Sequence, residues 1–357
     1  MHETLETYLD VWAGTEPRRA DIARTLRQAA VAARQVADLA ALGPLAGALG
    51  ATREGSRAGN VAGGDVQKEL DIRAEEFFID ALRSAPLAAI GSEESEAPIP
   101  LHAESRLVLA LDPLDGSGNI AINAPIGSIF SILPTLPDAP PAAALLQPGT
   151  AQLAAGFFLY GVETVLVLTL GAGTQVFTLD RRQNAFALTR RDLALPEGTH
   201  EYAINVSNYR HWEAPVRAYI DDCVAGAEGP RGVDFNMRWL ASVVGEAFRI
   251  LLRGGIYLYP GDARPGYREG RLRLVYEANP LAFLIEQAGG AASDGVQRIL
   301  TRVPRGLHQR VPLVFGSRDK VARIAAYCAG ELAVAEHAPL FGRRGLFRSS
   351  GDLAPCR

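Results

Sequence analysis

The stretch LALDPLDGSGN, residues 109–119, constrains the fold more than any other part of the sequence. An apolar run leads into Asp112 and Asp115, and the chain then turns on Gly-Ser-Gly. Pro113 disfavours a helix at Asp112, so we expect a buried strand that delivers both acids at its end. Ligands bind at the carboxyl ends of strands in open α/β sheets. Both carboxylates and the Leu114 carbonyl are therefore expected to face a common point.

Acids follow two further apolar runs in the same way. Glu93 and Glu94 come after residues 87–90, and Glu277 comes after the run RLRLVY. Carboxylates at close range repel each other unless a cation neutralises them, and hard oxygen ligands suit Mg²⁺ or Mn²⁺. A D-x-x-D spacing alone is more typical of a helix N-cap and turn. Its repetition at three predicted strand ends is what favours a metal site.

The turn after Asp115 adds a second chemical feature. Gly116, Ser117 and Gly118 are small residues that supply a hydroxyl and exposed backbone amides. Such amides hold phosphate where a helix or a nest begins. Metal ligands beside a phosphate-binding turn indicate phosphoryl chemistry.

Helical and strand patterns alternate along the rest of the chain, which predicts an α/β protein. The predicted helices cover residues 21–42, 71–83, 216–225, 240–252 and 280–288. The predicted strands cover residues 87–90, 107–111, 127–133, 156–160, 164–170, 175–179, 255–259, 271–276 and 312–315. Residues 134–149, which are rich in proline, are expected to form a loop.

Length and charge indicate the number of domains and exclude some classes of partner. A chain of 357 residues exceeds the size at which one hydrophobic core stops growing, so we expect two domains. A net charge of −4 without a block of like charge argues against nucleic-acid partners. The amino terminus has early acids and no long apolar segment, which predicts a cytoplasmic protein without a membrane partner. The three cysteines are widely spaced and are expected to be reduced thiols: Cys223, Cys328 and Cys356.

The sequence resembles the class I fructose-1,6-bisphosphatases, of bacterial type, between about Gly64 and Ser317. The matching motifs come in the order of that family: GDVQKELDIRAEE, GSEES, LDPLDGSGNI, YLYP, GRLRLVYEANPLAFLIEQAGGAASDG and LHQRVPLVFGS. DPLDG alone is shared with the wider family of metal-dependent sugar, inositol and nucleotide phosphatases. The long YEANPLAFLIEQAGG segment together with HQR is far more specific.

The resemblance implies a layered αβαβα sugar-phosphatase fold and a homotetramer. It also implies Mg²⁺-dependent hydrolysis of the 1-phosphate of D-fructose 1,6-bisphosphate. An N-terminal metal-binding domain is expected at residues 1–195, a substrate-binding α/β domain at 196–335, and a tail at 336–357. The metal ligands carried over from the family are Glu93, Asp112, Asp115, Glu277 and the carbonyl of Leu114. The catalytic acids carried over are Asp65, near a further metal position, and Asp71 and Glu94, which help to activate the attacking water.

The family also implies a substrate site. Asp115, Gly116, Ser117 and Gly118 are expected to contact the reacting phosphate. Three residues are expected to hold the other phosphate and the sugar: Asn205, Tyr259 and Arg271. Arg238 is expected to reach in from a neighbouring subunit. Arg271 stands where the family commonly has lysine, which keeps the positive charge and adds bidentate geometry.

Three positions depart from the family pattern. Gly118 and Ala121 replace a serine and an aspartate, which removes a hydroxyl and a carboxylate beside the expected metals and could lower the rate. Trp239 replaces a tyrosine, and an indole nitrogen donates a hydrogen bond but accepts none. A reshaped substrate pocket is expected from this change. The amino-terminal segment is also unlike that of the AMP-inhibited animal members, so AMP control is not expected.

Two alternatives stay open at this point. One is the same chemistry on sedoheptulose 1,7-bisphosphate, alone or with the fructose substrate, in gluconeogenesis or the Calvin cycle. The other is a degenerate relative that binds metal without turnover, motivated by Gly118 and Ala121. The presence of Glu93, Asp112 and Glu277 argues against that second alternative. Clustered acids destabilise a fold through their repulsion, so an inactive relative would gain nothing by keeping them.

Overall fold

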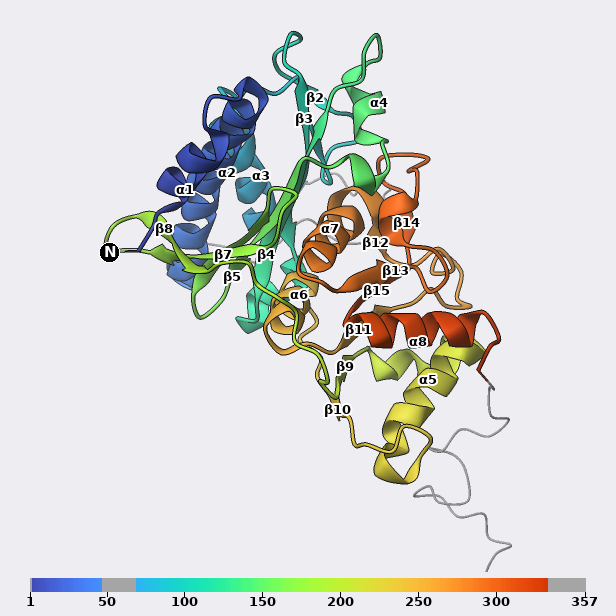
Figure 1. The fold of residues 1–357 in the computed structure, drawn as a ribbon. Helices are drawn as coiled ribbons and strands as arrows, with labels where there is room; N and C mark the ends of the chain where they lie inside the picture. Colours follow the sequence, from blue (N-terminus) through green and yellow to red (C-terminus); the bar gives the residue numbers. More distant parts are fainter. Residues whose placement is uncertain (1, 47–68, 333–357) are drawn as a thin grey trace, which may run out of the picture.

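A computed structural model describes residues 2–46 and 69–332 of the chain, and its elements stack in five layers (Figure 1). The first layer consists of three helices: α1 (Leu5–Ala13), α2 (Pro17–Leu42) and α3 (Glu69–Leu82). Helix α2 begins four residues before the predicted start, because Pro17 is favoured at the first helical position and Glu16 caps the free amides. Alanines of α2 pack its inner face against the sheet. The predicted helices at 21–42 and 71–83 are therefore confirmed.

An eight-stranded sheet forms the second layer, in the order β2-β1-β3-β4-β5-β6-β7-β8. Its strands are β1 (Ala89–Ser92), β2 (Ile99–Pro100), β3 (Leu107–Asp115), β4 (Ile126–Pro134), β5 (Ala154–Tyr160), β6 (Thr164–Thr169), β7 (Gln175–Asp180) and β8 (Ala185–Arg190). Strands β1 and β3 are parallel, and all other neighbours are antiparallel. Strands β3 to β6 are apolar on both faces because helices cover the sheet from both sides.

The third layer is a pair of central helices, α6 (Val243–Arg253) and α7 (Asn279–Gln287). Their apolar residues share one core with the inner faces of both sheets. Helix α6 begins at Val243 because the hydroxyl of Ser242 accepts a hydrogen bond from the Gly245 amide at 3.1 Å. These two helices position the ends of β3 and β4 relative to the second sheet.

A five-stranded sheet and two outer helices complete the layers. The sheet has the order β10-β9-β11-β15-β13. Its strands are β9 (Glu201–Ala203), β10 (Asn236–Met237), β11 (Ile256–Tyr259), β13 (Ala291–Ser293) and β15 (Leu313–Gly316). Helices α5 (Ala214–Val224) and α8 (Arg318–Cys328) cover its outer face. The resulting αβαβα order confirms the predicted fold class.

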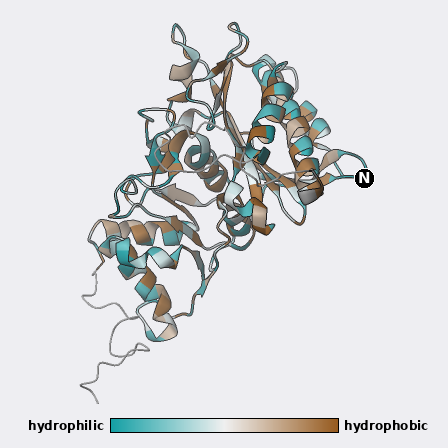
Figure 2. Cartoon of the chain, turned by 180° about the vertical axis from the view of Figure 1, so that it is seen from behind, coloured by the Kyte–Doolittle hydropathy of each residue, from teal (hydrophilic) through white to brown (hydrophobic). Residues whose placement is uncertain are grey.

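The remaining elements are short. A separate ladder pairs β12 (Leu272–Arg273) with β14 (Arg310–Val311) in antiparallel register. The short helical segments are α4 (Pro141–Leu145), 3-10 turns at Gly43–Ala46, Ser117–Ile122, Gly149–Ala151, Val206–His211, Gly226–Glu228 and Ile299–Thr301, and a π-helical turn at Leu274–Ala278. The outer helices carry both hydrophilic and hydrophobic residues, as expected for surface layers (Figure 2). Among the described helices, none combines the length and the apolar character needed to cross a bilayer.

Two local predictions were wrong. The strand predicted at 271–276 is only two residues long, and a π-helical turn follows it, so Glu277 does not directly follow a strand. The loop predicted at 134–149 contains helix α4, because Pro141 at a helix start is followed by a run of alanines. Cys223 and Cys328 are free thiols, as predicted. Cys356 and the predicted tail at 336–357 lie outside the described residues.

Candidate active site

Asp112 and Asp115 lie within β3 rather than beyond it, which corrects the predicted strand end at Leu111. Asp112 pairs with Ile129 of β4 and Asp115 pairs with Gly127, so β3 advances by three residues where β4 advances by two. In a regular strand, residues three apart point to opposite faces. The extra residue forms a β-bulge, which re-aims a side chain and is common beside active sites. The bulge therefore lets both acids point to one place.

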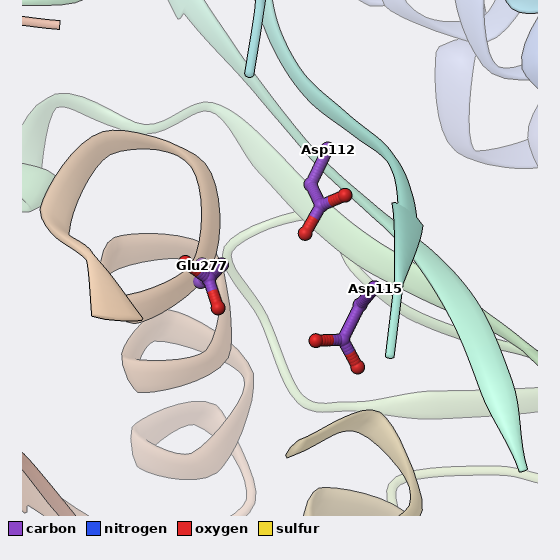
Figure 3. A group of neighbouring side chains, drawn as sticks. All are labelled: Asp112, Asp115 and Glu277. Carbon is purple, nitrogen blue, oxygen red and sulfur yellow. The ribbon is translucent and has the colours of Figure 1, made fainter. Parts of the chain in front are cut away.

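Glu277 completes a cluster of three carboxylates with Asp112 and Asp115 (Figure 3). Each residue contributes a carboxylate oxygen, and the three oxygens lie within 4.8 Å of one another. Asp112 and Glu277 are only 2% and 4% exposed. The π-helical turn after β12 brings Glu277 to the bulge, and the Arg273 amide fixes it by donating to Glu277 Oε2 at 2.6 Å.

The electrostatics of this cluster fit a divalent cation. Burial, followed by repulsion from neighbouring carboxylates, raises the pKa values of Asp112 and Glu277 well above their ordinary values. Burial raises the pKa of Asp115 to about 7, although the Val244 amide donates to it at 3.3 Å. Without a cation, three clustered carboxylates, two of them buried, cannot all ionise at neutral pH without a large cost in free energy. All-oxygen ligand sets of this kind suit hard divalent ions, so the residues present could hold one.

Glu93 and Glu94 follow β1 directly, as predicted, and lie beside the cluster. The Glu93 amide donates to the Leu111 carbonyl at 2.9 Å, which holds the end of β1 against β3. Burial, together with the charges of Glu93 and Asp71, raises the pKa of Glu94 to about 7. Asp71, in the first turn of α3, is 4% exposed. A carboxyl with a pKa near 7 can both accept and release a proton under physiological conditions.

Arg273 is a site residue that the sequence-based prediction missed. Its guanidinium forms an ion pair with the Glu93 carboxylate, and the side chains are 20% and 13% exposed. The nearby charges of Glu93, Glu277 and Asp112 raise the pKa of Arg273, against the effect of burial. The signal available in the sequence was the spacing Arg-x-x-x-Glu, which brings Arg273 and Glu277 together across one helical turn.

The glycine-rich turn follows the bulge. Gly116 has a φ of 80°, which only glycine adopts readily, and a 3-10 turn begins at Ser117. The Asn119 side chain donates to the carbonyls of Pro125 and Ala241, both at 3.0 Å. These bonds join the turn to the segment that precedes α6. The Gly118 position is open, with no atom within 4 Å of where a Cβ would stand.

Close approach of α6 to the sheet depends on Gly127. A Cβ at this position would lie 2.3 Å from the Phe158 carbonyl oxygen and 2.7 Å from Val244 Cγ2. Any side chain here would push the first turn of α6 away from β4. The Val244 amide would then lose its hydrogen bond to Asp115. The amides at the start of a helix favour anions because the helix dipole is positive at that end, which suits the Asp115 carboxylate.

Tyr259 and Arg271 lie near each other, as their predicted shared role requires. The Arg271 guanidinium carbon is 5.9 Å from the Tyr259 ring centroid and 4.8 Å from that of Tyr267. Burial raises the pKa of Tyr259, Arg271 lowers it, and the charge of Glu277 raises it, so this aromatic group borders the acidic cluster. Trp239 packs edge-on against Tyr259 with centroids 6.1 Å apart.

Three further residues were predicted for the site: Asn205, Leu114 and Asp65. Asn205 caps the 3-10 turn at Val206–His211, accepting hydrogen bonds from the Ser207 amide at 3.2 Å and its hydroxyl at 2.5 Å. Leu114 is buried, and its amide donates to Asp112 Oδ1 at 3.1 Å. Asp65 lies outside the described residues.

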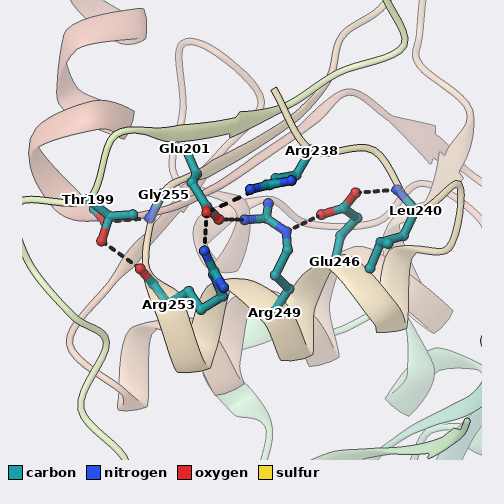
Figure 4. A network of polar contacts seen from close by, with 9 residues as sticks. Thr199, Glu201, Arg238, Leu240, Glu246, Arg249, Arg253 and Gly255 are labelled. Carbon is teal, nitrogen blue, oxygen red and sulfur yellow. Dashed lines mark hydrogen bonds and ion pairs between the residues drawn. The ribbon is translucent and has the colours of Figure 1, made fainter. Parts of the chain in front are cut away.

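Arg238 belongs to a network of ion pairs around Glu201 (Figure 4). Its Nε atom lies 3.7 Å from Glu201 Oε1, and its side chain is 53% exposed. Arg249 and Arg253 donate to the same carboxylate at 2.7 and 2.5 Å. Among the described residues, no ion pair links Arg238 to the carboxylate cluster.

Glu246 extends this network and supports the segment that carries Arg238. Its side chain is fully buried, and it accepts hydrogen bonds from Arg249 Nε at 2.8 Å and from the Leu240 amide at 2.7 Å. Burial raises the pKa of Glu246, while Arg249 and the Leu240 amide lower it. Arg249 therefore bridges two buried acids and ties α6 to β9.

The layered fold is that of a phosphatase, as comparison with known proteins shows. Residues 17–191 match the family described as fructose-1-6-bisphosphatase, N-terminal domain, and residues 195–329 match the C-terminal domain. The chain belongs to the class 1 fructose-1,6-bisphosphatase family, as its motifs predicted.

Individual relatives agree with this assignment. The class 1 fructose-1,6-bisphosphatase of Azorhizobium caulinodans is 58% identical over 91% of this chain and 98% of its own length. That of Rhizobium meliloti is 53% identical over 97% of this chain and 99% of its own. The holo form of Leishmania major fructose-1,6-bisphosphatase superposes with a TM-score of 0.84 at 33% identity, covering 92% of this chain and 99% of that one.

Proposed function

We propose that this protein hydrolyses the 1-phosphate of D-fructose 1,6-bisphosphate, giving fructose 6-phosphate and inorganic phosphate. The observation that carries the proposal is the cluster of Asp112, Asp115 and Glu277, whose oxygens lie within 4.8 Å of one another. This cluster lies beside the glycine-rich turn and the start of α6, in a chain of the fructose-1,6-bisphosphatase family.

The cluster is proposed to bind Mg²⁺, with Mn²⁺ as an alternative. Glu93, Asp112, Asp115, Glu277 and the Leu114 carbonyl are the proposed ligands, and Asp65 is proposed to lie near a further metal position. When bound, these cations supply Lewis-acid stabilisation of charge on the phosphoryl oxygens. The raised pKa values of Asp112 and Glu277 support the ligand set, because a cation removes the repulsion that raises them.

Residues of the chain itself are proposed to bind the reacting phosphate and to activate the attacking water. The amides of Gly116, Ser117 and Gly118 hold the reacting phosphate, and the Arg273 guanidinium balances its charge. Glu94, whose pKa is about 7, accepts a proton from the attacking water, and Asp71 orients this carboxyl. The water oxygen attacks phosphorus, and the bond from phosphorus to the sugar oxygen breaks. The electron pair stays on the sugar oxygen, which takes a proton from solvent.

The far end of the substrate is proposed to lie against the second sheet. Asn205, Tyr259 and Arg271 hold the 6-phosphate and the sugar. Arg238 acts on the site of a neighbouring subunit in a homotetramer, which fits its 53% exposure. The enzyme is proposed to work in the cytoplasm, in gluconeogenesis or the Calvin cycle.

The test is release of inorganic phosphate from fructose 1,6-bisphosphate and sedoheptulose 1,7-bisphosphate, measured side by side. Each substrate is assayed with Mg²⁺, with Mn²⁺ and with a chelator. Metal-dependent release from the fructose substrate supports the proposal, and the ratio of the two kcat/KM values gives the preference. Equal release with and without chelator contradicts the metal role. No release from either substrate by the folded protein would mean that Gly118 and Ala121 mark a lost activity.

A further inference from the structure

A surface cavity of about 420 Å³ lies apart from the carboxylate cluster, on the side of the β12–β14 ladder. Its size falls in the range of small-molecule sites. Four arginines line it: Arg268, Arg302, Arg305 and Arg310. The other lining residues are Glu269, Asp294, Val296, Gln297 and Pro312.

The lining is positive, although the whole chain has a net charge of −4. Four arginines and two acids line the cavity. The two acids differ in how fully their carboxylates are already bound by other groups. Asp294 is satisfied, since it accepts from the amides of Val296 and Gln297 at 2.8 and 2.7 Å and pairs with Arg302. Its carboxylate holds Arg302 in place at the wall of the cavity.

The second acid competes only weakly for an incoming anion. Glu269 lies 3.6 Å from Arg305, and the two side chains are 70% and 73% exposed. Exposed pairs of this kind contribute about 0–1 kcal/mol, so a multiply charged anion readily displaces them. Arg268 forms no ion pair in the described ranges 2–46 and 69–332. Several guanidinium groups converging on one cavity match the oxygen geometry of phosphate and carboxylate groups.

The cavity is connected to the active site through the backbone. Arg310 is the direct partner of Arg273 in the β12–β14 ladder, and the Leu274 amide donates to the Gln309 carbonyl at 2.8 Å. Arg273 in turn pairs with Glu93 beside the carboxylate cluster. Arg268 precedes Arg271 by three residues in the segment that leads into β12. A ligand that contacts Arg268 and Arg310 thus contacts the residue three positions before Arg271 and the ladder partner of Arg273.

We propose that this arginine cavity binds a small polyanion, a molecule with two or more phosphate or carboxylate groups, and that the bound polyanion acts as an effector of the active site. The binding stands on the cavity itself. The effector role rests also on the proposed function, because it acts through Arg271 and Arg273.

The test begins with binding to the full-length, metal-free protein. Inorganic pyrophosphate and tricarballylate are titrated by calorimetry into the wild type and into the double variant Arg268→Gln/Arg305→Gln. The matched control is Arg182→Gln/Arg298→Gln, which removes two exposed, ion-paired arginines that do not line the cavity. Circular dichroism and melting curves verify that both variants are folded.

We expect the cavity variant to lose at least tenfold in affinity for one class of sites, while the control stays within twofold of the wild type. Preference for pyrophosphate over tricarballylate would identify a phosphorylated ligand, and the reverse a polycarboxylate. Equal affinities in the cavity variant and the wild type, or equal losses in both double variants, would overturn the binding site.

The effector role is tested by phosphate release at constant free Mg²⁺, with and without the tighter of the two polyanions. We expect at least a twofold change in KM or kcat in the wild type and in the control variant, and no change in the cavity variant. Binding without any kinetic change would overturn the effector role and leave the binding site standing. Metal-dependent turnover without polyanion binding would overturn this inference while leaving the proposed function intact.

Discussion

The guanidinium of Arg273 forms an ion pair with the carboxylate of Glu93 beside the carboxylates of Asp112, Asp115 and Glu277. The two residues come from different sheets, since Glu93 follows β1 of the eight-stranded sheet and Arg273 ends β12 of the two-stranded ladder. This pair places one positive group within a site that otherwise consists of carboxylates. It offsets part of their repulsion and leaves a cation in position to contact a bound phosphate.

Replacing Arg273 by glutamine is expected to destabilise the metal-free protein by about 3 kcal/mol, because it leaves Glu93 unpaired among other acids. Saturating Mg²⁺ is expected to reduce this loss, since a bound cation takes over the neutralisation. Chemical denaturation with and without Mg²⁺ measures both values. The control is Arg298→Gln, which breaks an exposed pair and should cost under about 1 kcal/mol. An equal loss in the two variants would contradict the proposed role of the pair.

Asp115→Asn is expected to lower kcat at least about 1,000-fold, because several kcal/mol of charge stabilisation depend on the metal ligands. The fold should persist, since asparagine has nearly the same shape. Phosphate release and circular dichroism measure the two effects. Asp138→Asn is the control, because Asp138 is exposed and its φ of 57° suits asparagine. Full activity in Asp115→Asn would contradict the proposed mechanism.

Removal of metal is expected to lower the melting temperature. A ligand at 100 times its Kd stabilises the native state by about 2.7 kcal/mol, which corresponds to a shift of about 4 °C for a chain of this size. Thermal scans with Mg²⁺ and with chelator measure the shift. In Asp112→Asn the difference between the two scans should largely disappear. A shift as large as in the wild type would show that the metal binds elsewhere.

Glu201→Gln is expected to lower the free energy of unfolding at pH 7 by about 3 kcal/mol, because Arg249 and Arg253 lose their shared buried partner. Although burial alone raises the pKa of Glu201, the hydrogen bond from Arg253 and the charge of Arg249 hold it below the usual 4.5. A carboxyl with a lowered pKa stabilises the fold above 4.5 and loses that effect as pH falls through the folded value.

The difference in stability between the wild type and Glu201→Gln should therefore be constant above about pH 5.5 and shrink below pH 4.5. Urea denaturation across this pH range measures the trend. Asp38→Asn, at the exposed pair with Arg181, provides the comparison and should change little at any pH. A difference that grows on acidification would contradict the assigned ion pairs.

Trp239→Tyr is expected to lower KM for fructose 1,6-bisphosphate by up to about tenfold, because a phenol can offer the phosphate one further hydrogen bond. The indole of Trp239 stacks on Tyr257 at 6.0 Å with an interplanar angle of 2°. A tyrosine ring can keep this packing, so kcat should stay within about twofold of the wild type. Steady-state kinetics measure both constants. Trp212→Tyr is the control for a general loss of aromatic packing, because Trp212 is buried in a different hydrophobic cluster. Equal changes of KM in both variants would contradict a local effect of Trp239.

The sequence by itself predicted the long helices, most central strands and the acids that the fold brings together. Apolar periodicity identified the long helices and the central strands, because burial of an apolar stripe depends only on local spacing. The acids at 93–94 and 112–115 stood out because charged residues beside buried strands are costly without a ligand. The order of the motifs indicated the family and, through it, the five-layer architecture.

Only the tertiary structure decided how these residues meet. The bulge that turns Asp112 and Asp115 to one side depends on pairing with β4, and the π-helical turn that delivers Glu277 replaces a predicted strand. The ion pair of Arg273 with Glu93 and the arginine cavity likewise join segments far apart along the chain. Local sequence encodes propensity and spacing, whereas register, bulges and long-range ion pairs are fixed by which neighbours the packed layers provide.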